Sequence, residues 1–364
     1  MRWYTVDMSK RVYVGLSGGV DSSVTAALLK KQGYQVTGVY MKNWSQDLPG
    51  FTCPWKVDFT DAKRVAVQLD IPFKMYDFEK EYRQKVVDYM VAEYQAGRTP
   101  NPDIMCNQEV KFKLFLEAAL EDGADMIATG HYARVHHSLR EDGSIAAAEM
   151  RKAKDDNKDQ TYFLYRITEQ ALMHTLFPLG DLTKPEVRRL AEEFGLVTAT
   201  KKESMGICFV GKVGIKEFLL HELGPQQPGA IIDQNGKRVG QHDGAIFYTI
   251  GQRHGLDVGG GMPFYVVGKD MQTNEVYVTT DISDERLWHE NFTMTSVHWI
   301  RETPKDGKKV QVRTRHRSPL IGARVHTLDN GIEVQLDDPI RALTPGQSAV
   351  IYDGEKVLGG GILI

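Results

Sequence analysis

The chain has 364 residues, of which 41% are apolar and 26% are charged, and its formal net charge is −3. This length predicts two or three domains, and the composition is typical of a water-soluble globular protein. The slightly acidic balance excludes a uniformly basic nucleic-acid-binding protein, although a local basic face remains possible. There is no apolar run of about 18 residues and no signal peptide at residues 1–7, so we expect a cytoplasmic protein without membrane contact.

The first part of the chain alternates between short apolar runs and segments with helical periodicity. We predict strands at 12–16, 36–41, 71–76 and 124–129, and helices at 22–31, 59–69, 82–94 and 112–120. Such alternation predicts an α/β domain, in which a parallel sheet is covered by helices on both faces.

The pattern changes after about residue 215. Short alternating runs at 265–268, 276–279, 309–314, 323–326, 332–336 and 349–352 are separated by glycine-containing turns. This composition predicts an all-β barrel or sandwich at the C-terminus. We expect a catalytic domain at 1–215, a small central domain at 216–285 and a β-barrel domain at 286–364.

A glycine- and serine-rich loop, Ser17-Gly18-Gly19-Val20-Asp21-Ser22, joins the first strand to the first helix. Glycines allow a close backbone approach, and the amides and dipole at a helix start favour an anion such as phosphate. Asp21 would repel phosphate, a conflict that a bound Mg²⁺ would resolve. The alternative is an ordinary strand-to-helix turn in which Ser and Asp act as caps.

The loop is not the standard P-loop. The nearest match to that motif, residues 206–213, ends in Val213, which cannot ligate Mg²⁺. We therefore treat that match as coincidental.

The three cysteines are too few for a disulfide framework, and none belongs to a C-x-x-C pair, which argues against zinc. Cys106 follows Pro100 and Pro102, which predict a loop that presents Asp103 and Cys106 just ahead of the next helix. Lys111 and Lys113, which are nearby in the sequence, would lower the pKa of the Cys106 thiol. For Cys106 and Cys208 the alternative is a buried apolar role, and for Cys53 we keep that role.

A basic run near the C-terminus, residues 312–317, carries Arg313, Arg315 and Arg317 at alternating positions. On a strand these charges would share one face and suit a phosphate backbone. The alternative is a solvated strand face.

The loop at residues 17–22 resembles the pyrophosphate-loop motif of ATP pyrophosphatases, which cleave ATP between its α and β phosphates. Further segments resemble, in order, the signatures of tRNA-specific 2-thiouridylases, over nearly the whole chain. These segments are residues 97–107, 129–133, 158–164, 204–209, 248–253, 345–347 and 359–361. Thr161 stands where the family usually has Ser, which keeps the hydroxyl.

The resemblance implies that ATP adenylates the 2-carbonyl oxygen of the wobble uridine of tRNA, which is extruded from its stack. A persulfide on Cys208 would then deliver the sulfur, and Cys106 would assist as nucleophile and form a transient disulfide with Cys208. Asp103 would act as acid or base. A cysteine desulfurase or sulfur-relay protein would supply the persulfide.

The resemblance also assigns binding residues. Its ATP contacts, with Mg²⁺, fall on Gly15, Leu16, Ser17, Gly18, Gly19, Val20, Asp21, Ser22, Met41 and Gly130. Its tRNA contacts fall on Asn101, Pro102, Asp103, His131, Lys158, Asp159, Gln160, Arg315, His316 and Gln347. The central domain is expected to contribute to tRNA binding.

Three alternatives stay open from the sequence. Another pyrophosphate-loop enzyme that modifies tRNA or forms amides is one, although an amidating ligase would need an ammonia source, and no cysteine stands at the N-terminus. A non-catalytic nucleotide- or RNA-binding protein is the second, but it would not need two cysteines in polar surroundings. The third concerns the cofactor, since Asp103, Cys106 and Cys208 could ligate an iron–sulfur cluster.

Overall fold

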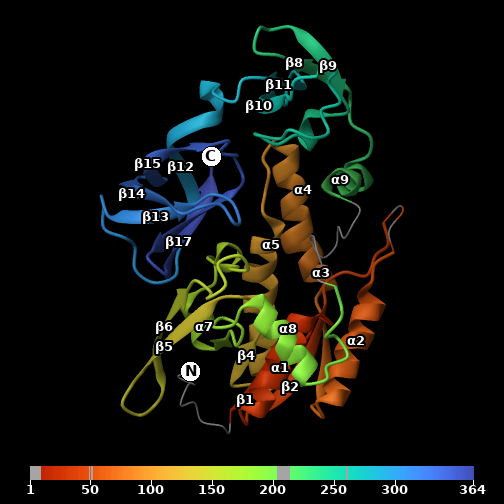
Figure 1. Cartoon of the computed structure of the whole chain (residues 1–364), viewed down its shortest axis with the longest axis vertical. Coiled ribbons are helices and arrows are strands. Elements are labelled where there is room, and N and C mark those ends of the chain that lie inside the picture. The colour runs from red at the N-terminus through yellow and green to blue at the C-terminus, as the bar shows by residue number, and fades with distance from the viewer. Residues whose placement is uncertain (1–9, 49, 51, 203–213, 260) are drawn as a thin grey trace.

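The computed structural model of the chain describes residues 10–48, 50, 52–202, 214–259 and 261–364. Figure 1 shows a sheet-and-helix domain around β1, a small part with β8 to β11 at the opposite end, and a barrel beside the helical segment that connects them. Among the described residues, no helix is both long and apolar enough to cross a membrane.

The N-terminal domain is built on a parallel five-stranded sheet of order β3-β2-β1-β4-β7. The strands are β1 (Arg11–Gly15), β2 (Gln35–Lys42), β3 (Phe73–Asp77), β4 (Met126–Ala128) and β7 (Thr175–Leu176). The helices are α1 (Val20–Lys31), α2 (Trp55–Gln68), α3 (Glu79–Tyr82), α4 (Asp88–Gln95), α5 (Pro102–Met105), α6 (Phe115–Glu121), α7 (Glu169–Met173) and α8 (Lys184–Glu193). Two π-helical segments, η1 (Arg83–Val87) and η2 (Cys106–Leu114), and a 3₁₀ turn, η3 (Thr161–Phe163), complete the domain. The predicted parallel sheet is confirmed.

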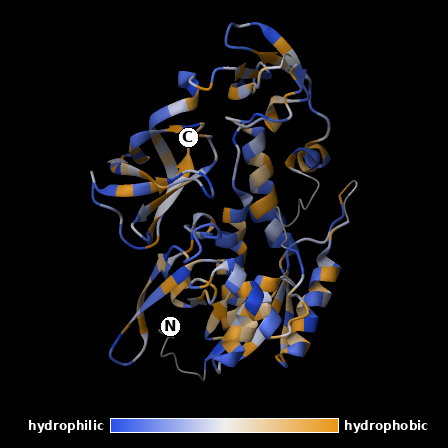
Figure 2. Ribbon diagram, in the orientation of Figure 1, coloured by the Kyte–Doolittle hydropathy of each residue, from blue (hydrophilic) through white to orange (hydrophobic). Residues whose placement is uncertain are grey.

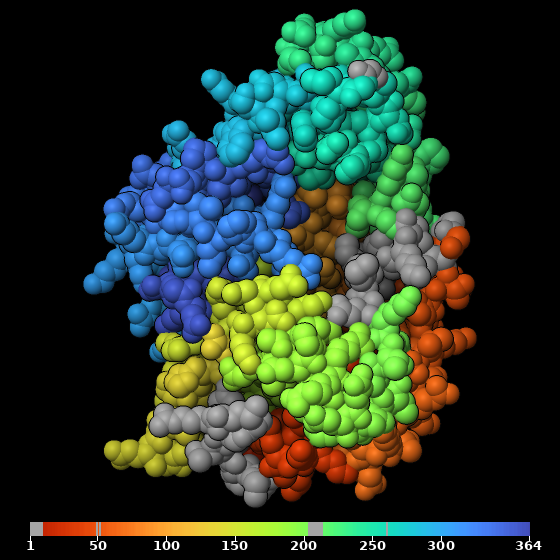
Figure 3. All heavy atoms as spheres, viewed as in Figure 1, coloured from red at the N-terminus to blue at the C-terminus, as the bar shows by residue number. Residues whose placement is uncertain are grey.

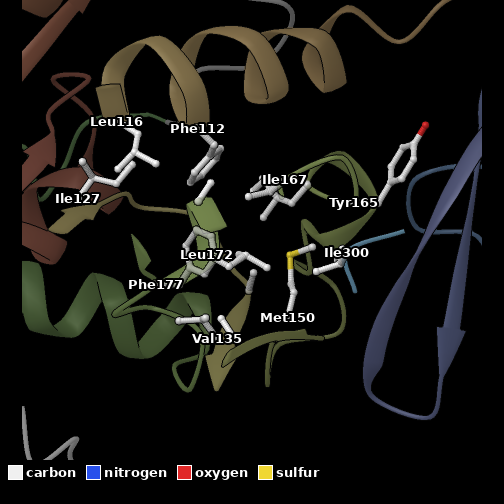
Figure 4. Packing of buried hydrophobic residues seen from close by; sticks show 14 of the residues in the cluster. Phe112, Leu116, Ile127, Val135, Met150, Tyr165, Ile167, Leu172, Phe177 and Ile300 are labelled. Atoms are coloured by element: carbon white, nitrogen blue, oxygen red, sulfur yellow. The ribbon is translucent and has the colours of Figure 1, made fainter. Parts of the chain in front are cut away.

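Both faces of this sheet are buried, as a doubly covered parallel sheet requires. Along β1, Val12 and Val14 pack on one side with residues of α1 and α2. Tyr13 packs on the other side with Phe115 and Leu116 of α6. Figure 4 shows Phe112 and Leu116 pointing from their helix toward Leu172 and Phe177.

A hairpin after β4 was not predicted. It consists of β5 (Arg134–Leu139) and β6 (Ile145–Arg151), which pair in antiparallel fashion. The three alanines at 146–148 favour helix by intrinsic propensity, so local preference concealed the strand. Arg151 of β6 pairs with Lys356 of the C-terminal barrel, so the hairpin joins the two domains.

The central part is a four-stranded sheet of order β10-β11-β8-β9, preceded by helix α9 (Ile215–Leu223). Its strands are β8 (Gly229–Ile232), β9 (Arg238–His242), β10 (Tyr265–Asp270) and β11 (Glu275–Thr279), with 3₁₀ turns η4 (Ala245–Phe247) and η5 (Glu285–Leu287). Ile231, Val266 and Val276 are all 0% exposed and form its own small core.

The C-terminal part is a closed antiparallel barrel, which decides between the barrel and sandwich predicted from the sequence. The strands follow the order β12-β15-β14-β13-β16-β17, and β17 pairs with β12 to close the ring. They are β12 (Trp288–Trp299), β13 (Lys309–Arg313), β14 (Ile321–Leu328), β15 (Gly331–Arg341), β16 (Ser348–Asp353) and β17 (Lys356–Leu363). Figure 2 shows the alternation of hydrophobic and hydrophilic residues along these strands.

The glycine run in β17 has a packing reason. A Cβ on Gly359 would lie 2.1 Å from the carbonyl oxygen of His298, and one on Gly360 would lie 2.3 Å from that of Ala349. Strands on both sides therefore approach the β17 backbone too closely for any side chain.

Candidate functional site

The loop at residues 17–22 lies between β1 and α1, at the carboxyl end of the central strand of the sheet. The Ser22 hydroxyl donates to the carbonyl of Gly19 (3.1 Å) and accepts from the Ser17 amide (3.2 Å). Gly18 has a φ of +74°, and a Cβ there would lie 2.3 Å from the carbonyl oxygen of Asp58, so only glycine fits. Gly19 precedes the first residue of α1 and provides no side-chain cap, which leaves the first amides of the helix to an anion.

Three other residues assigned to ATP border this loop. A Cβ on Gly130 would lie 2.8 Å from the Ser22 amide nitrogen, and one on Gly15 would lie 2.9 Å from the terminal carbon of Met41. Leu16 and Val20 are 1% and 4% exposed and belong to the core. The structure thus brings the predicted ATP residues together around one helix start.

Asp21 does not project alone into this site. Both of its carboxylate oxygens accept from the ammonium of Lys184, at 2.7 and 2.8 Å. The Tyr132 hydroxyl donates to the same carboxylate at 2.9 Å. The sequence suggested that Mg²⁺ would offset the negative charge of Asp21, but in this structure the Lys184 ammonium does so.

The cysteine-bearing segment differs from its prediction. Pro102 does not block the helix but occupies its first turn, where a missing amide hydrogen costs nothing. Asp103 and Cys106 consequently lie within a continuous helical segment, α5-η2-α6, and not in a loop ahead of it. Cys106 is 3% exposed and begins the π-helical stretch, a geometry that recurs at functional sites.

The predicted acid or base has a perturbed environment. Burial raises the pKa of Asp103, and nearby Lys111 partly opposes that rise. Lys113, the other lysine expected to influence Cys106, bonds Glu109 at 3.4 Å, and Glu109 also accepts from Lys85.

Cys208 lies outside the residues that the structure describes, as does its flanking segment. Cys53 is partly buried, and burial raises the pKa of its thiol, in keeping with the structural role expected for it.

The segment that leads into this helix is fastened to the barrel. The Asn101 amide donates to the Gln347 side chain (2.9 Å), and its oxygen accepts from the Ser348 amide (2.9 Å). Gln347 also donates to the carbonyl of Thr99 at 2.7 Å, and the Thr99 amide donates to that of Pro345 at 2.9 Å. We call this contact, between residues 99–101 and 345–348, the barrel clamp. Pro102, the next residue, is buried.

The segment 158–160 has three different surroundings. Asp159 is 1% exposed and pairs with Arg313 of β13 at 3.0 Å, so its carboxylate faces the outer surface of the barrel and not solvent. Thr161, in place of the usual serine, donates its hydroxyl to Asp159 at 2.7 Å. Gln160 accepts from the Tyr132 amide at 2.9 Å, and Lys158 is partly exposed.

The prediction that three arginines share one strand face is wrong. Strand β13 ends at Arg313, and the chain then bends. Arg313 is 7% exposed and pairs with Asp159 of the N-terminal domain. Arg315 bonds the carbonyl of Ala342 at 2.6 Å, and Arg317 has a φ of +64°. Alternation in sequence does not place side chains on one face once the strand has ended.

The two predicted histidines lie against aromatic rings. The His316 ring is 4.6 Å from that of Phe163, and the His131 ring is 5.6 Å from that of Phe112. Burial lowers the pKa of both, so both favour the neutral form at neutral pH.

Two residues beside the loop, Lys184 and Tyr132, were not predicted as site residues, although Tyr132 belongs to the signature segment 129–133. Lys184 stands in Thr183-Lys184-Pro185, which signals only a helix start. A cleft of about 490 Å³, lined by Glu149, Arg301 and Lys356 among others, lies at the hairpin–barrel junction, away from the residues described above.

The parallel sheet and its glycine–serine loop have the form of a nucleotide-binding domain, and the family model that matches them describes a HUP domain. A family model described as "tRNA methyl transferase HUP domain" matches residues 10–212. Models described as "tRNA methyl transferase PRC-barrel domain" and "Aminomethyltransferase beta-barrel domain" match residues 216–280 and 289–363.

Curated relatives match almost end to end. A protein of Geobacillus kaustophilus, named tRNA-specific 2-thiouridylase MnmA 2, is 49% identical over 97% of this chain and 94% of its own length. A protein of Lactococcus lactis subsp. cremoris, named tRNA-specific 2-thiouridylase MnmA, is 48% identical over the same shares. The chain belongs to the family of tRNA-specific 2-thiouridylases.

Two similar solved structures each cover somewhat more than half of this chain. A 4-thiouridine synthetase in complex with RNA and ATP is 19% identical, with a TM-score of 0.38, and covers 59% of this chain and 50% of its own. An NMN synthetase from Francisella tularensis is 17% identical, with a TM-score of 0.32, and covers 54% and 66%.

Proposed function

We propose that this protein transfers sulfur to the 2-position of the wobble uridine of tRNA in a reaction that consumes ATP. The observation that carries this proposal is the 48–49% identity, over 97% of the chain, to relatives named tRNA-specific 2-thiouridylases. Two family-model descriptions name methyl transfer instead, but the near-full-length relatives are named for thiolation.

ATP would bind at residues 17–22, with its phosphates on the first amides of α1. The absence of a side-chain cap at Gly19 and the closeness of Gly130 support this placement. The uridine 2-oxygen would attack the α-phosphorus, release pyrophosphate and become an adenylate. This step makes the oxygen a good leaving group, since it then departs with AMP.

Mg²⁺ would accompany the phosphates and supply charge to the leaving pyrophosphate. Asp21, the carboxylate of the loop, is paired with Lys184 in this structure, so we assign no protein ligand to the metal. Among the described residues, no three His, Cys, Asp or Glu side chains gather at a metal-binding distance. An iron–sulfur cluster would need Cys208, which lies outside those residues, and we include no cluster in the proposal.

Sulfur would arrive as a persulfide on Cys208, made by a cysteine desulfurase or a sulfur-relay protein. Its terminal sulfur would attack carbon 2 of the adenylated base, and the bond from that carbon to the AMP-bearing oxygen would break. The Cys106 thiolate would then attack the Cys208 sulfur, break the sulfur–sulfur bond to the base and leave a Cys106–Cys208 disulfide. An external thiol would reduce that disulfide before the next cycle.

Asp103 lies one helical turn from Cys106, within the same segment. Its raised pKa supports a role in proton transfer, since a poised carboxyl can both accept and return a proton. We infer that Asp103 accepts and returns the proton of the Cys106 thiol or of the base.

The tRNA would lie near Pro102, His131, Lys158, Arg315 and His316. Asn101, Asp159 and Gln347 are engaged in contacts between domains here, so we propose that they act mainly by holding the surrounding segments. Figure 3 shows the barrel (blue) packed against the yellow segments that follow β4 in the chain.

The test is a nucleoside analysis by mass spectrometry. Unmodified tRNA is incubated with the full-length protein, ATP and a persulfide donor, then digested. We expect 2-thiouridine to appear only when ATP is present. A product of unchanged mass, or methylated uridine, would contradict the proposal.

Serine variants test the two-cysteine mechanism. Replacing sulfur with oxygen at Cys106 or Cys208 removes a nucleophile, so we expect each variant to lose at least about 100-fold in 2-thiouridine formation while ATP binding persists. Cys53→Ser is the matched control and should retain activity. Normal thiolation by Cys106→Ser or Cys208→Ser would refute this mechanism.

A further inference from the structure

The phosphate loop contains one acidic residue, Asp21, in the first turn of α1. A carboxylate there would repel the phosphates that the loop is proposed to bind, because all of these groups are anionic. Three observations show how the fold deals with this charge.

The first observation is the pairing of Asp21 with Lys184. The Lys184 ammonium lies 2.7 and 2.8 Å from the two carboxylate oxygens, and Lys184 is 9% exposed. A lysine is rarely this buried unless it is paired. The Lys184 and Asp21 side chains are 11% and 31% exposed, so the pair is partly shielded from water and retains more of its attraction than a pair on the surface.

The second observation is that Lys184 is presented by a well-anchored helix start. Thr183 and Glu186 form a capping box at the start of α8. The Lys184 amide donates to Asp155 at 2.9 Å, so the backbone that carries the ammonium is held on two sides.

The third observation is the Tyr132 hydroxyl, which donates to Asp21 at 2.9 Å. Tyr132 is 2% exposed, and its ring lies beneath the Lys184 ammonium, with 5.7 Å to the centroid. Gln160 holds the Tyr132 backbone through two bonds of 2.9 Å, one from each residue's amide.

We propose that Lys184 is a positioning residue of the phosphate loop, whose ammonium cancels the charge of Asp21 and, with the Tyr132 hydroxyl, holds that carboxylate in place. The inference rests on the proposed binding of ATP at this loop. In this inference the Lys184 ammonium contacts Asp21 of the loop and does not contact the nucleotide itself. An uncompensated Asp21 would then be the main obstacle to ATP in any variant that lacks the ammonium.

The test measures the affinity of the full chain for a non-hydrolysable ATP analogue by calorimetry. We expect Lys184→Met to bind the analogue roughly 10-fold more weakly, or worse, because it leaves an anion beside the phosphates. The loss should shrink at high salt, where that repulsion is screened. Adding Asp21→Asn to Lys184→Met should restore affinity to within about threefold of the wild-type value, since the repelling charge is gone.

Lys154→Met is the matched control, because this substitution removes an equal charge. Lys154 pairs at 3.2 Å with Glu186 of α8, the helix that carries Lys184. It should bind the analogue like the wild-type protein. Wild-type affinity of Lys184→Met would overturn the inference. An equally weak double variant would also overturn it, since Lys184 would then contact the nucleotide directly. Failure of the wild-type protein to bind would instead refute the proposed function.

Discussion

At the scale of single residues, the proposed chemistry involves side chains whose surroundings differ from those that the sequence suggested. The sequence predicts Asp103 and Cys106 in a loop ahead of the helix, yet both lie within a helical segment, where Cys106 is 3% exposed and Asp103 is partly buried. Burial raises the cost of ionising a carboxyl group, which is why the pKa of Asp103 is raised.

The raised pKa of Asp103 makes a prediction about stability. A carboxyl whose folded-state pKa exceeds its unfolded-state value stabilises the protein below the unfolded-state value, and this contribution is lost as the pH rises through the folded-state value. Asp103→Asn should therefore raise the Tm relative to wild type more at about pH 7 than at about pH 4, as thermal unfolding would measure. Asp88→Asn, at an exposed site on α4, is the control and should show no such trend. A Tm difference for Asp103→Asn that narrows with rising pH would contradict the assignment.

At the scale of elements, the decisive feature is the helical segment that starts at Pro102. Its first turn carries Asp103, its second begins at Cys106, and the preceding residues are held by the barrel clamp. A Cβ on Gly346, whose φ is +92°, would lie 2.8 Å from the Thr99 amide nitrogen. The backbones of the two segments of the barrel clamp are therefore in close contact. The barrel thereby sets where the helix begins.

Gln347→Ala should weaken this clamp. The variant loses the acceptor for Asn101 and the donor to Thr99, and we expect the free energy of unfolding to fall by roughly 1–3 kcal/mol. The Cys106 thiol should also react faster with an alkylating reagent, which mass spectrometry would follow. Gln335→Ala, at an exposed site on β15, is the control. Unchanged stability and thiol reactivity in Gln347→Ala would mean that the clamp does not position the helix.

At the scale of the whole molecule, the barrel and the N-terminal domain are joined through buried polar contacts. The ion pair between Asp159 and Arg313 has side-chain exposures of 0% and 8%, and the Arg313 guanidinium also lies over the ring of Tyr352, 5.6 Å from its centroid. Strand β6 extends the barrel sheet from the N-terminal side. We infer that the barrel and the N-terminal domain stabilise each other and unfold as one unit.

Arg313→Met tests that unit, because it leaves the Asp159 carboxylate buried without its cation. We expect a loss of about 3–5 kcal/mol in the free energy of unfolding, measured by urea denaturation. The double variant Arg313→Met/Asp159→Asn should recover most of this loss, since no buried charge remains. Lys309→Met, at an exposed position of the same strand, should change the stability little. If Arg313→Met were as stable as wild type, the pair would not hold the domains together.

Much of the architecture was predictable from local pattern. The strand–loop–helix unit at residues 11–31, the parallel sheet and the C-terminal β domain all follow from periodicity and turn residues, which are properties of neighbours in the chain. The hairpin at 134–151 was not predictable, because its alanines favour helix and only the contact with β17 makes it part of a sheet.

The sequence by itself determined the class of protein, since the loop at 17–22 and the ordered signature segments are local patterns of residue type. Only the tertiary structure decided what several signature residues touch. Asp21 meets Lys184, 163 positions away, and Asn101 meets Gln347, 246 positions away. Such partners are chosen by the packing of whole domains, because charge pairing and hydrogen bonding depend on distance in space and not along the chain.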